Sequence, residues 1–138
     1  MNSAAGQFID ANVLMYSMGG PHPLRSPCKE ILKKIKEGRV KAVTNTEALQ
    51  EILYRFFSIK KYSLAEVVYT SMVEFCEKVL PVTLKDTDLA LELLKKSPGI
   101  TSRDAIHAAT MINNGIKDIY STDSHFDLIA GIRRLQPG

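Results

Sequence analysis

Four acidic side chains stand in this sequence where a fold could bring them to one place. Asp10 directly follows an apolar run near the start of the chain, and Asp123 follows another apolar run near its end. Glu51 and Asp104 lie in segments with helical periodicity. Carboxylates held close together repel and raise each other's pKa values, a conflict that a divalent cation removes. Because all the ligands would be oxygens, the set suits Mg²⁺ or Mn²⁺ and not zinc.

Each of these acids also has a purely local explanation. Asp104 lies three residues after a threonine and could complete a helix capping box, although it also heads an apolar helix stripe. Asp123 could be a turn residue after a strand. Glu51 lies off the apolar face of its helix, as a solvated glutamate would. Glu47, three residues after Thr44, is well explained as a capping-box glutamate.

Several further polar residues lie close to these acids in the sequence. Asn12 could be a helix N-cap, and Asp127 could be an ordinary surface acid. His22, His107 and His125 lack the spacing of zinc ligands. We expect His107 on a helix surface or in support of the metal ligands, and the sequence leaves the role of His125 open.

The elements that must position the acids alternate between short apolar strands and amphipathic helices. Strands are expected at residues 7–10, 40–43, 79–82, 118–121 and 132–135. Helices are expected at 12–17, 26–37, from a capping box at 44–47 through 56, at 63–78, 85–96, and from 101 to 115. This alternation predicts a three-layer α/β/α fold, in which helices flank a parallel sheet of about five strands.

The strand order decides whether the acids can meet. Pro81 indicates that the third strand lies at an edge of the sheet. In the order 3-2-1-4-5 the first and fourth strands are neighbours, and ligands bind where the order reverses, beyond the carboxyl ends of the strands. Asp10 and Asp123 would then face each other, with Glu51 and Asp104 entering from flanking helices.

The composition is that of an ordinary globular domain. The 138 residues are 45% hydrophobic and 24% charged, and the net charge of +3 is too small to indicate a nucleic-acid partner by itself. Two distant cysteines without a CxxC motif favour a reducing cytoplasm over a disulfide framework. We expect no signal peptide and no membrane association, because no apolar run approaches the ~18 residues that span a bilayer.

Taken together, these patterns resemble the PIN domain family, and most closely its VapC-like toxin ribonucleases. The resemblance covers nearly the whole chain, which would be a single PIN domain, residues 1–138. The matching motifs are FIDAN at 8–12, VTN at 43–45 with LQE at 49–51, RDAIHAAT at 103–110 and STDSHFD at 121–127. Asn45 departs from the commoner serine but keeps a polar helix cap.

The resemblance implies a role for each acid. Asp10, Glu51, Asp104 and Asp123 match the catalytic quartet of the family, and the family register selects Glu51 over Glu47. Asp10, Asp104 and Asp123 would hold the metal. Three further residues match the family motifs. Asp127 matches an additional acid that could also bind metal, and Asn12 and Ser121 match supporting polar positions.

The implied function is a Mg²⁺- or Mn²⁺-dependent endoribonuclease that hydrolyses RNA phosphodiester bonds. It would be the toxin of a VapBC-type toxin–antitoxin pair, a homodimer inhibited by a VapB-like antitoxin that presents an arginine to the carboxylates. Arg103 is a candidate contact to RNA phosphate, and Tyr16, Tyr54 or Tyr62 could stack on a base.

Three alternatives remain open on the sequence. The chain could be a housekeeping PIN nuclease in RNA processing, or a PIN-like binding module without activity. It could also be a Mg²⁺-dependent phosphatase of the haloacid dehalogenase type. Against the phosphatase, the second acid expected two residues after Asp10 is Asn12, and the chain has no length for a cap domain.

Overall fold

Five short parallel strands form the centre of the molecule. A computed structural model describes residues 5–137. Its strands are β1 (Gln7–Ile9), β2 (Ala42–Asn45), β3 (Lys78–Leu80), β4 (Asp118–Tyr120) and β5 (Arg133–Leu135). They pair in the order β3-β2-β1-β4-β5, every neighbouring pair being parallel. The predicted α/β class, strand order and edge position of β3 are therefore confirmed.

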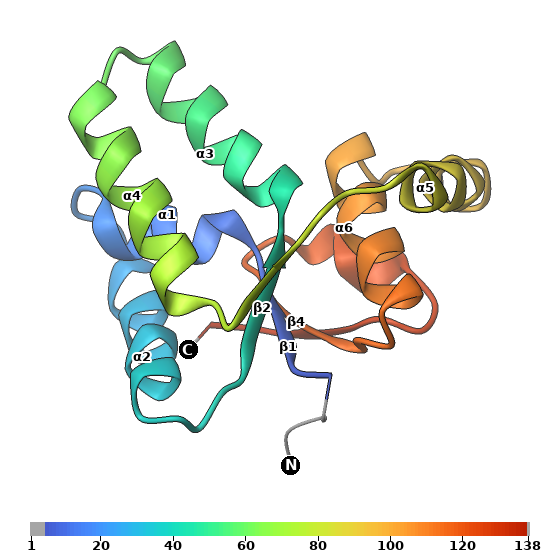
Figure 1. The fold of residues 1–138 in the computed structure, drawn as a ribbon, viewed down its shortest axis with the longest axis horizontal. Helices are drawn as coiled ribbons and strands as arrows, with labels where there is room; N and C mark the ends of the chain where they lie inside the picture. The colour runs from blue at the N-terminus through green and yellow to red at the C-terminus, as the bar shows by residue number, and fades with distance from the viewer. Residues whose placement is uncertain (1–4, 138) are drawn as a thin grey trace.

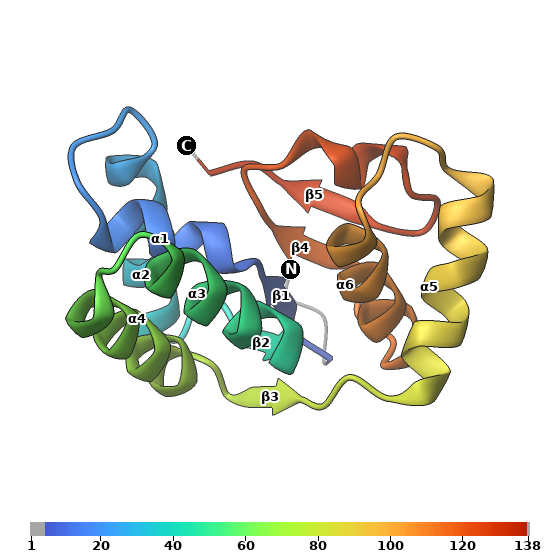
Figure 2. The same cartoon turned by 90° about the horizontal axis from the view of Figure 1, so that it is seen from above.

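Helices cover both faces of this sheet, as Figures 1 and 2 show. One face carries α1 (Ala11–Met18), α2 (Arg25–Lys36), α3 (Thr46–Ser58) and α4 (Tyr62–Phe75). The other carries α5 (Leu84–Lys96), α6 (Ser102–Asn113) and the 3₁₀ helix η1 (Ser124–Leu128). Within the part of the chain that the structure describes, no helix combines the length and apolar composition needed to cross a membrane.

The central strand β1 divides the hydrophobic core into two. Because side chains alternate along a strand, Ile9 enters the cluster beneath α1–α4 whereas Phe8 enters the cluster beneath α5 and α6. Both side chains are fully buried. The position of Asp10 is thus fixed by two anchored neighbours at the carboxyl end of the strand.

Two predicted helix starts are wrong. Thr44 does not cap α3, because it lies in β2, where its backbone is paired with β3 and its hydroxyl donates to the carbonyl oxygen of Ile9 at 2.9 Å. Asn45 is the N-cap instead, its side chain accepting from the Ala48 amide at 3.0 Å. Asn12 is not an N-cap either, since α1 begins one residue earlier and Asp10 occupies the cap position.

Other element bounds shift by a few residues. Helix α4 ends at Phe75 and not near residue 78, since Cys76 already has extended backbone. Strand β3 ends before Pro81, which lacks the amide hydrogen that a longer strand would use. These shifts lie at the ends of elements and leave the topology unchanged.

A buried polar network connects α6 with the end of β2 and with α5. The Asn45 amide group donates to Thr110 Oγ1 at 3.0 Å, and Asn113 donates to the buried carboxylate of Asp86 at 2.8 Å. These contacts join β2, α5 and α6. They therefore fix the distance between the helix that carries Asp104 and the strand that leads to Glu51.

Candidate active site

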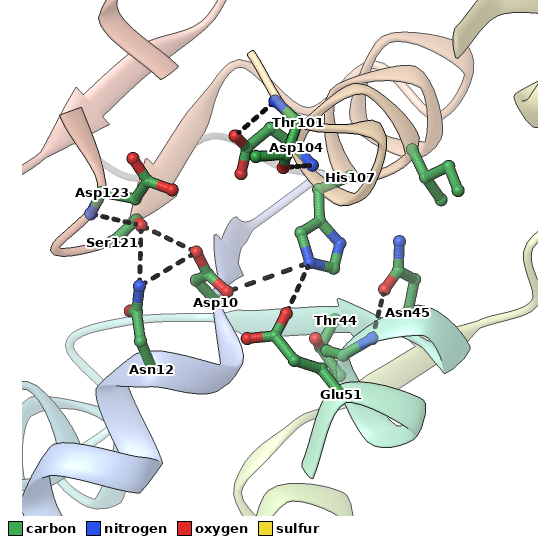
Figure 3. A network of polar contacts seen from close by, with 12 residues as sticks. Asp10, Asn12, Thr44, Asn45, Glu51, Thr101, Asp104, His107, Ser121 and Asp123 are labelled. Carbon is green, nitrogen blue, oxygen red and sulfur yellow. Dashed lines mark hydrogen bonds and ion pairs between the residues drawn. The ribbon is translucent and has the colours of Figure 1, made fainter. Parts of the chain in front are cut away.

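Asp10 lies at the junction of β1 and α1, directly beside the end of β4. Its backbone amide donates to the carbonyl oxygen of Tyr120 at 3.1 Å, which continues the pairing of the two strands. Ser121 follows, and its hydroxyl donates to Asp10 Oδ2 at 2.7 Å. Asn12, the second residue of α1, donates to the same oxygen at 3.3 Å. These contacts leave Asp10 Oδ1 facing away from them, into the site (Figure 3).

The Asp10 carboxyl group is almost completely buried, with 4% of its surface exposed. Burial raises its pKa from 3.8 to about 6, and the charge of Glu51 contributes to the rise, whereas His107 and the Ser121 hydrogen bond oppose it. Keeping this group ionised at neutral pH therefore costs free energy in the protein without a cation.

Asp10 and Glu51 meet at a histidine from α6, and we call Asp10, Glu51 and His107 the inner cluster. His107 Nε2 lies 3.8 Å from Asp10 Oδ1 and 3.8 Å from Glu51 Oε1. Both separations are too long for hydrogen bonds. The imidazole is 1% exposed, and neither ring nitrogen has a hydrogen-bond partner among the described residues.

The charge state of His107 reflects its two acidic neighbours. Burial by itself would lower the pKa of this imidazole, but Glu51 and Asp10 outweigh burial and raise the pKa above its ordinary value. On its other side the ring packs against Phe8, with ring centroids 5.1 Å apart. The imidazole is thus held between an apolar ring and two carboxylates.

A second group, Asp104, Asp123 and His125, forms the outer cluster. His125 Nδ1 lies 3.0 Å from Asp104 Oδ2 and 3.1 Å from Asp123 Oδ1. Asp104 also completes a capping box with Thr101, so its predicted capping role is confirmed, yet its carboxylate is turned into the site (Figure 3). Asp123 caps η1 by accepting from the His125 amide at 2.9 Å.

One hydroxyl group connects the two clusters. Ser121 Oγ donates to Asp10 and accepts from the backbone amide of Asp123 at 3.0 Å and from Asn12 Nδ2 at 3.3 Å. A hydroxyl group has one hydrogen to donate and two lone pairs, so Ser121 is saturated. The residues predicted as supporting, Asn12 and Ser121, thus lie in direct contact with Asp10.

The structure brings four of the five predicted acids together and leaves one outside. Asp10 and Glu51 belong to the inner cluster, and Asp104 and Asp123 to the outer cluster. Asp127 lies in neither, because its carboxylate forms a two-bond pair with Arg134, at 3.0 and 3.1 Å. That pairing holds the pKa of Asp127 below its usual range.

Both His107 and His125 lie beside the predicted acids, a proximity that the sequence did not establish. His107 is not on a helix surface, because α6 turns it under the site together with Asp104. The spacing of three residues between Asp104 and His107 could have indicated that His107 faces the site. Residues three apart lie on the same face of a helix, and the apolar residues on that face of α6 are buried. His125 follows Asp123 by two residues, close enough to share the same turn.

Both clusters fit a divalent cation. Within each, one atom from every residue lies within 4.8 Å of the others. In the inner cluster Asp10 Oδ1 and the unpartnered imidazole face a common position, which is what a metal ligand set requires. Each set of two carboxylates and one imidazole could therefore hold a divalent metal ion.

Comparison with known proteins agrees with this arrangement. The profile of the PIN domain matches residues 8–132. Ribonuclease VapC13 of Mycobacterium tuberculosis is 32% identical over 127 residues, which are 92% of this chain and 97% of VapC13.

Two solved structures share the fold at low sequence identity. One is VapC20 of Mycobacterium tuberculosis, described as a sarcin–ricin loop cleaving toxin, with a TM-score of 0.71, 17% identity, and coverage of 85% of this chain and 89% of VapC20. The other is a toxin–antitoxin complex from Klebsiella pneumoniae, with a TM-score of 0.70, 16% identity, and coverage of 96% of this chain and 98% of that one.

Proposed function

The chain belongs to the PIN domain family, and we propose that it is a metal-dependent endoribonuclease that acts as the toxin of a VapBC-type pair. The observation that carries the proposal is the convergence of Asp10, Glu51, Asp104 and Asp123 at the carboxyl ends of β1 and β4 (Figure 3). Ribonuclease activity of the relative VapC13 supports the same reaction for this chain.

We propose Mg²⁺ or Mn²⁺ as the cofactor, held by Asp10, Asp104 and Asp123 with Glu51 beside them. When bound, such an ion supplies an activated water and neutralises charge on the phosphate during in-line displacement. The four carboxylates of the two clusters support this assignment, because carboxylate oxygens are ligands that both ions prefer.

The remaining residues would act by holding these carboxylates. Ser121 and Asn12 occupy Asp10 Oδ2, so only Oδ1 is left for a ligand. His125 lies between Asp104 and Asp123 and contacts both carboxylates. This contact would reduce the repulsion between the two carboxylates and keep them directed into the site. Glu51, whose side chain is 17% exposed, would orient the attacking water.

Partners follow from the same proposal. The substrate is RNA, and a VapB-like antitoxin would cover the acidic site, as the structural likeness to a toxin–antitoxin complex suggests. We further propose a single-domain homodimer that acts in the cytoplasm, where its two free cysteines, Cys28 and Cys76, would stay reduced. If no antitoxin gene adjoins the locus and none co-purifies, a housekeeping PIN nuclease becomes the better assignment.

The direct test is cleavage of a panel of structured RNAs with Mn²⁺, with Mg²⁺ and with EDTA. We expect cleavage only with metal, and a loss of more than about 100-fold in Asp10→Asn, because removal of groups that merely support ligands already costs roughly 10- to 100-fold. Glu92→Gln is the matched control, since Glu92 is an exposed acid on α5 that pairs with Lys95. Cleavage that persists in EDTA or in Asp10→Asn would contradict the proposal, and no cleavage by the wild type would favour a silent binding module.

A further inference from the structure

A cavity of about 480 Å³ opens directly beside the inner cluster, between α1, α3 and the start of α6. Asn12 and Glu51 belong to its lining as well as to the acidic site. We propose that this cavity binds one unstacked nucleotide of the substrate RNA, next to the phosphodiester that is cut. The inference rests on the proposed function and adds to it the residues that would select the cleavage position.

The charge of the cavity favours an anion. Arg55, Lys61 and Arg103 line it, and none of these three side chains forms an ion pair or hydrogen bond with another described residue. Glu51 is the one acid among the lining residues that the structure describes. Three unpaired cations around one acid leave an excess of positive charge, which a phosphate of the RNA backbone would neutralise.

The same cavity offers aromatic faces. Tyr54 is 62% exposed, unusually open for a large ring, and it lies on α3 one turn after Glu51. Tyr16 also lines the cavity and stacks on His22, with ring centroids 4.5 Å apart. Stacking on a tyrosine is a general way for proteins to hold an unstacked base, whichever base it is.

A nucleotide combines the two properties that the cavity requires. Its phosphate matches the cations and its base matches the tyrosines, whereas a protein segment would need acidic residues spaced to reach all three cations. Bases that project from RNA loops and single strands are the ones that proteins bind in this way. Because Glu51 is shared between the cavity and the inner cluster, a base seated on Tyr54 places the adjoining backbone at the acidic site.

This assignment also separates the tyrosines that the sequence could not distinguish. Tyr62 is similarly exposed, at 53%, but it lines a different groove on the α3–α4 hairpin and packs against Phe57 with ring centroids 5.0 Å apart. Tyr54 and Tyr16 are therefore the stacking residues, and Tyr62 serves as a matched control.

The test uses the full chain in EDTA and single-stranded RNA oligomers that carry 2-aminopurine at one internal position. Stacking quenches 2-aminopurine fluorescence, so titration of protein into RNA reports both affinity and seating of the base. We expect Tyr54→Ala to weaken the quenching interaction roughly 5- to 150-fold and Tyr54→Phe to retain it, because the ring and not the hydroxyl makes the stack. Arg103→Ala should weaken affinity and its salt dependence while the remaining bound fraction is still quenched.

Several outcomes would overturn the inference. These are no quenching by the wild type, unchanged quenching in Tyr54→Ala, or equal losses in Tyr54→Ala and Tyr62→Ala. Cleavage of the same oligomers in Mn²⁺ separates this inference from the proposed function. Wild-type cleavage together with unaltered quenching in Tyr54→Ala removes the nucleotide cavity and keeps the nuclease. Tyr54-dependent quenching without cleavage of these oligomers or of the panel of structured RNAs keeps the cavity and contradicts the nuclease.

Discussion

The inner and outer clusters are built from the same parts, two carboxylates and one imidazole each, yet they differ in how well those parts are satisfied. In the outer cluster His125 lies 3.0 and 3.1 Å from its acids and is 43% exposed. In the inner cluster His107 lies 3.8 Å from both acids and is 1% exposed. The outer cluster can therefore keep its shape through hydrogen bonds and water. The inner cluster is desolvated and lacks such bonds, so its stability depends on what binds there.

The largest effect expected from this difference is on the pH dependence of stability in the metal-free protein. The pKa of Asp10 is about 6 in the folded state and 3.8 as the unperturbed value, so between these values the folded state holds a proton that the unfolded state has lost. The free energy of unfolding should then fall as pH rises from about 4 to about 6, by roughly 2–3 kcal/mol. Chemical denaturation in EDTA across this pH range measures it.

Two variants sharpen that prediction. Asp10→Asn should remove this part of the pH dependence and be more stable than the wild type above pH 6. His107→Gln should move the midpoint to higher pH, because His107 lowers the pKa of Asp10. Adding Mn²⁺ should restore stability mainly above pH 6, where Asp10 is ionised. A wild-type profile that is flat in EDTA would show that burial of Asp10 carries no such cost.

The next effect concerns the hydroxyl group that joins the two clusters. Ser121→Ala removes the hydrogen bond to Asp10 and the acceptor for the Asp123 amide. We expect Mn²⁺ affinity to fall roughly 10- to 100-fold, as for other groups that orient metal ligands. Isothermal titration calorimetry measures the affinity independently of RNA cleavage. Ser121→Thr keeps the hydroxyl and is the comparison variant; equal binding by Ser121→Ala and the wild type would contradict the role.

A smaller effect is expected from His125, because its imidazole is 43% exposed, whereas that of His107 is 1% exposed. His125→Asn should change the free energy of unfolding at pH 7.5 by less than about 1 kcal/mol, since ion pairs with a solvent-exposed partner contribute little. His107→Asn, which leaves a buried void beside Phe8, should cost more. Parallel urea denaturation of the two variants makes the comparison. A larger loss of unfolding free energy for His125→Asn than for His107→Asn would contradict the view that the inner cluster is the more sensitive of the two.

The smallest effect is expected at Asp127. This acid pairs with Arg134 outside both clusters, so Asp127→Asn should alter RNA cleavage by less than about 3-fold, in line with the modest contribution of exposed ion pairs. A rate assay at saturating Mn²⁺ is the measurement. A loss as large as that of Asp10→Asn would return Asp127 to the metal ligands that the sequence resemblance suggested.

The sequence predicted the fold well because the relevant information was local. Each strand was a short apolar run between helices, and Pro81 indicated that the third strand lies at an edge. The full order β3-β2-β1-β4-β5, which places Asp10 beside the end of β4, was implied by the family resemblance. Helix periodicity did not select Glu51 over Glu47; the family register did. The predicted catalytic and metal-binding roles of the acids remain to be measured.

What the sequence did not predict depends on distant partners. Helix periodicity shows which face carries His107, but not that Phe8 lies against its ring from a strand far away in the chain. Arg134 in β5 removes Asp127 from the site, and nothing near Asp127 in the sequence indicated that pairing. Thr44 has the spacing of a capping residue, yet its hydroxyl donates a hydrogen bond to the carbonyl oxygen of Ile9 instead.

The bond between Ser121 and Asp10 also has a consequence for the synthesis of the protein. The two residues are 111 positions apart, and β4 must pair with β1 before they can meet. A chain that emerges from the ribosome at about 5–20 residues per second therefore exposes Asp10 long before Ser121, Asp123 and His125 exist to complete the site. With the catalytic roles proposed above, a nascent chain would be unable to cut the messenger RNA that encodes it until translation of that message is nearly finished.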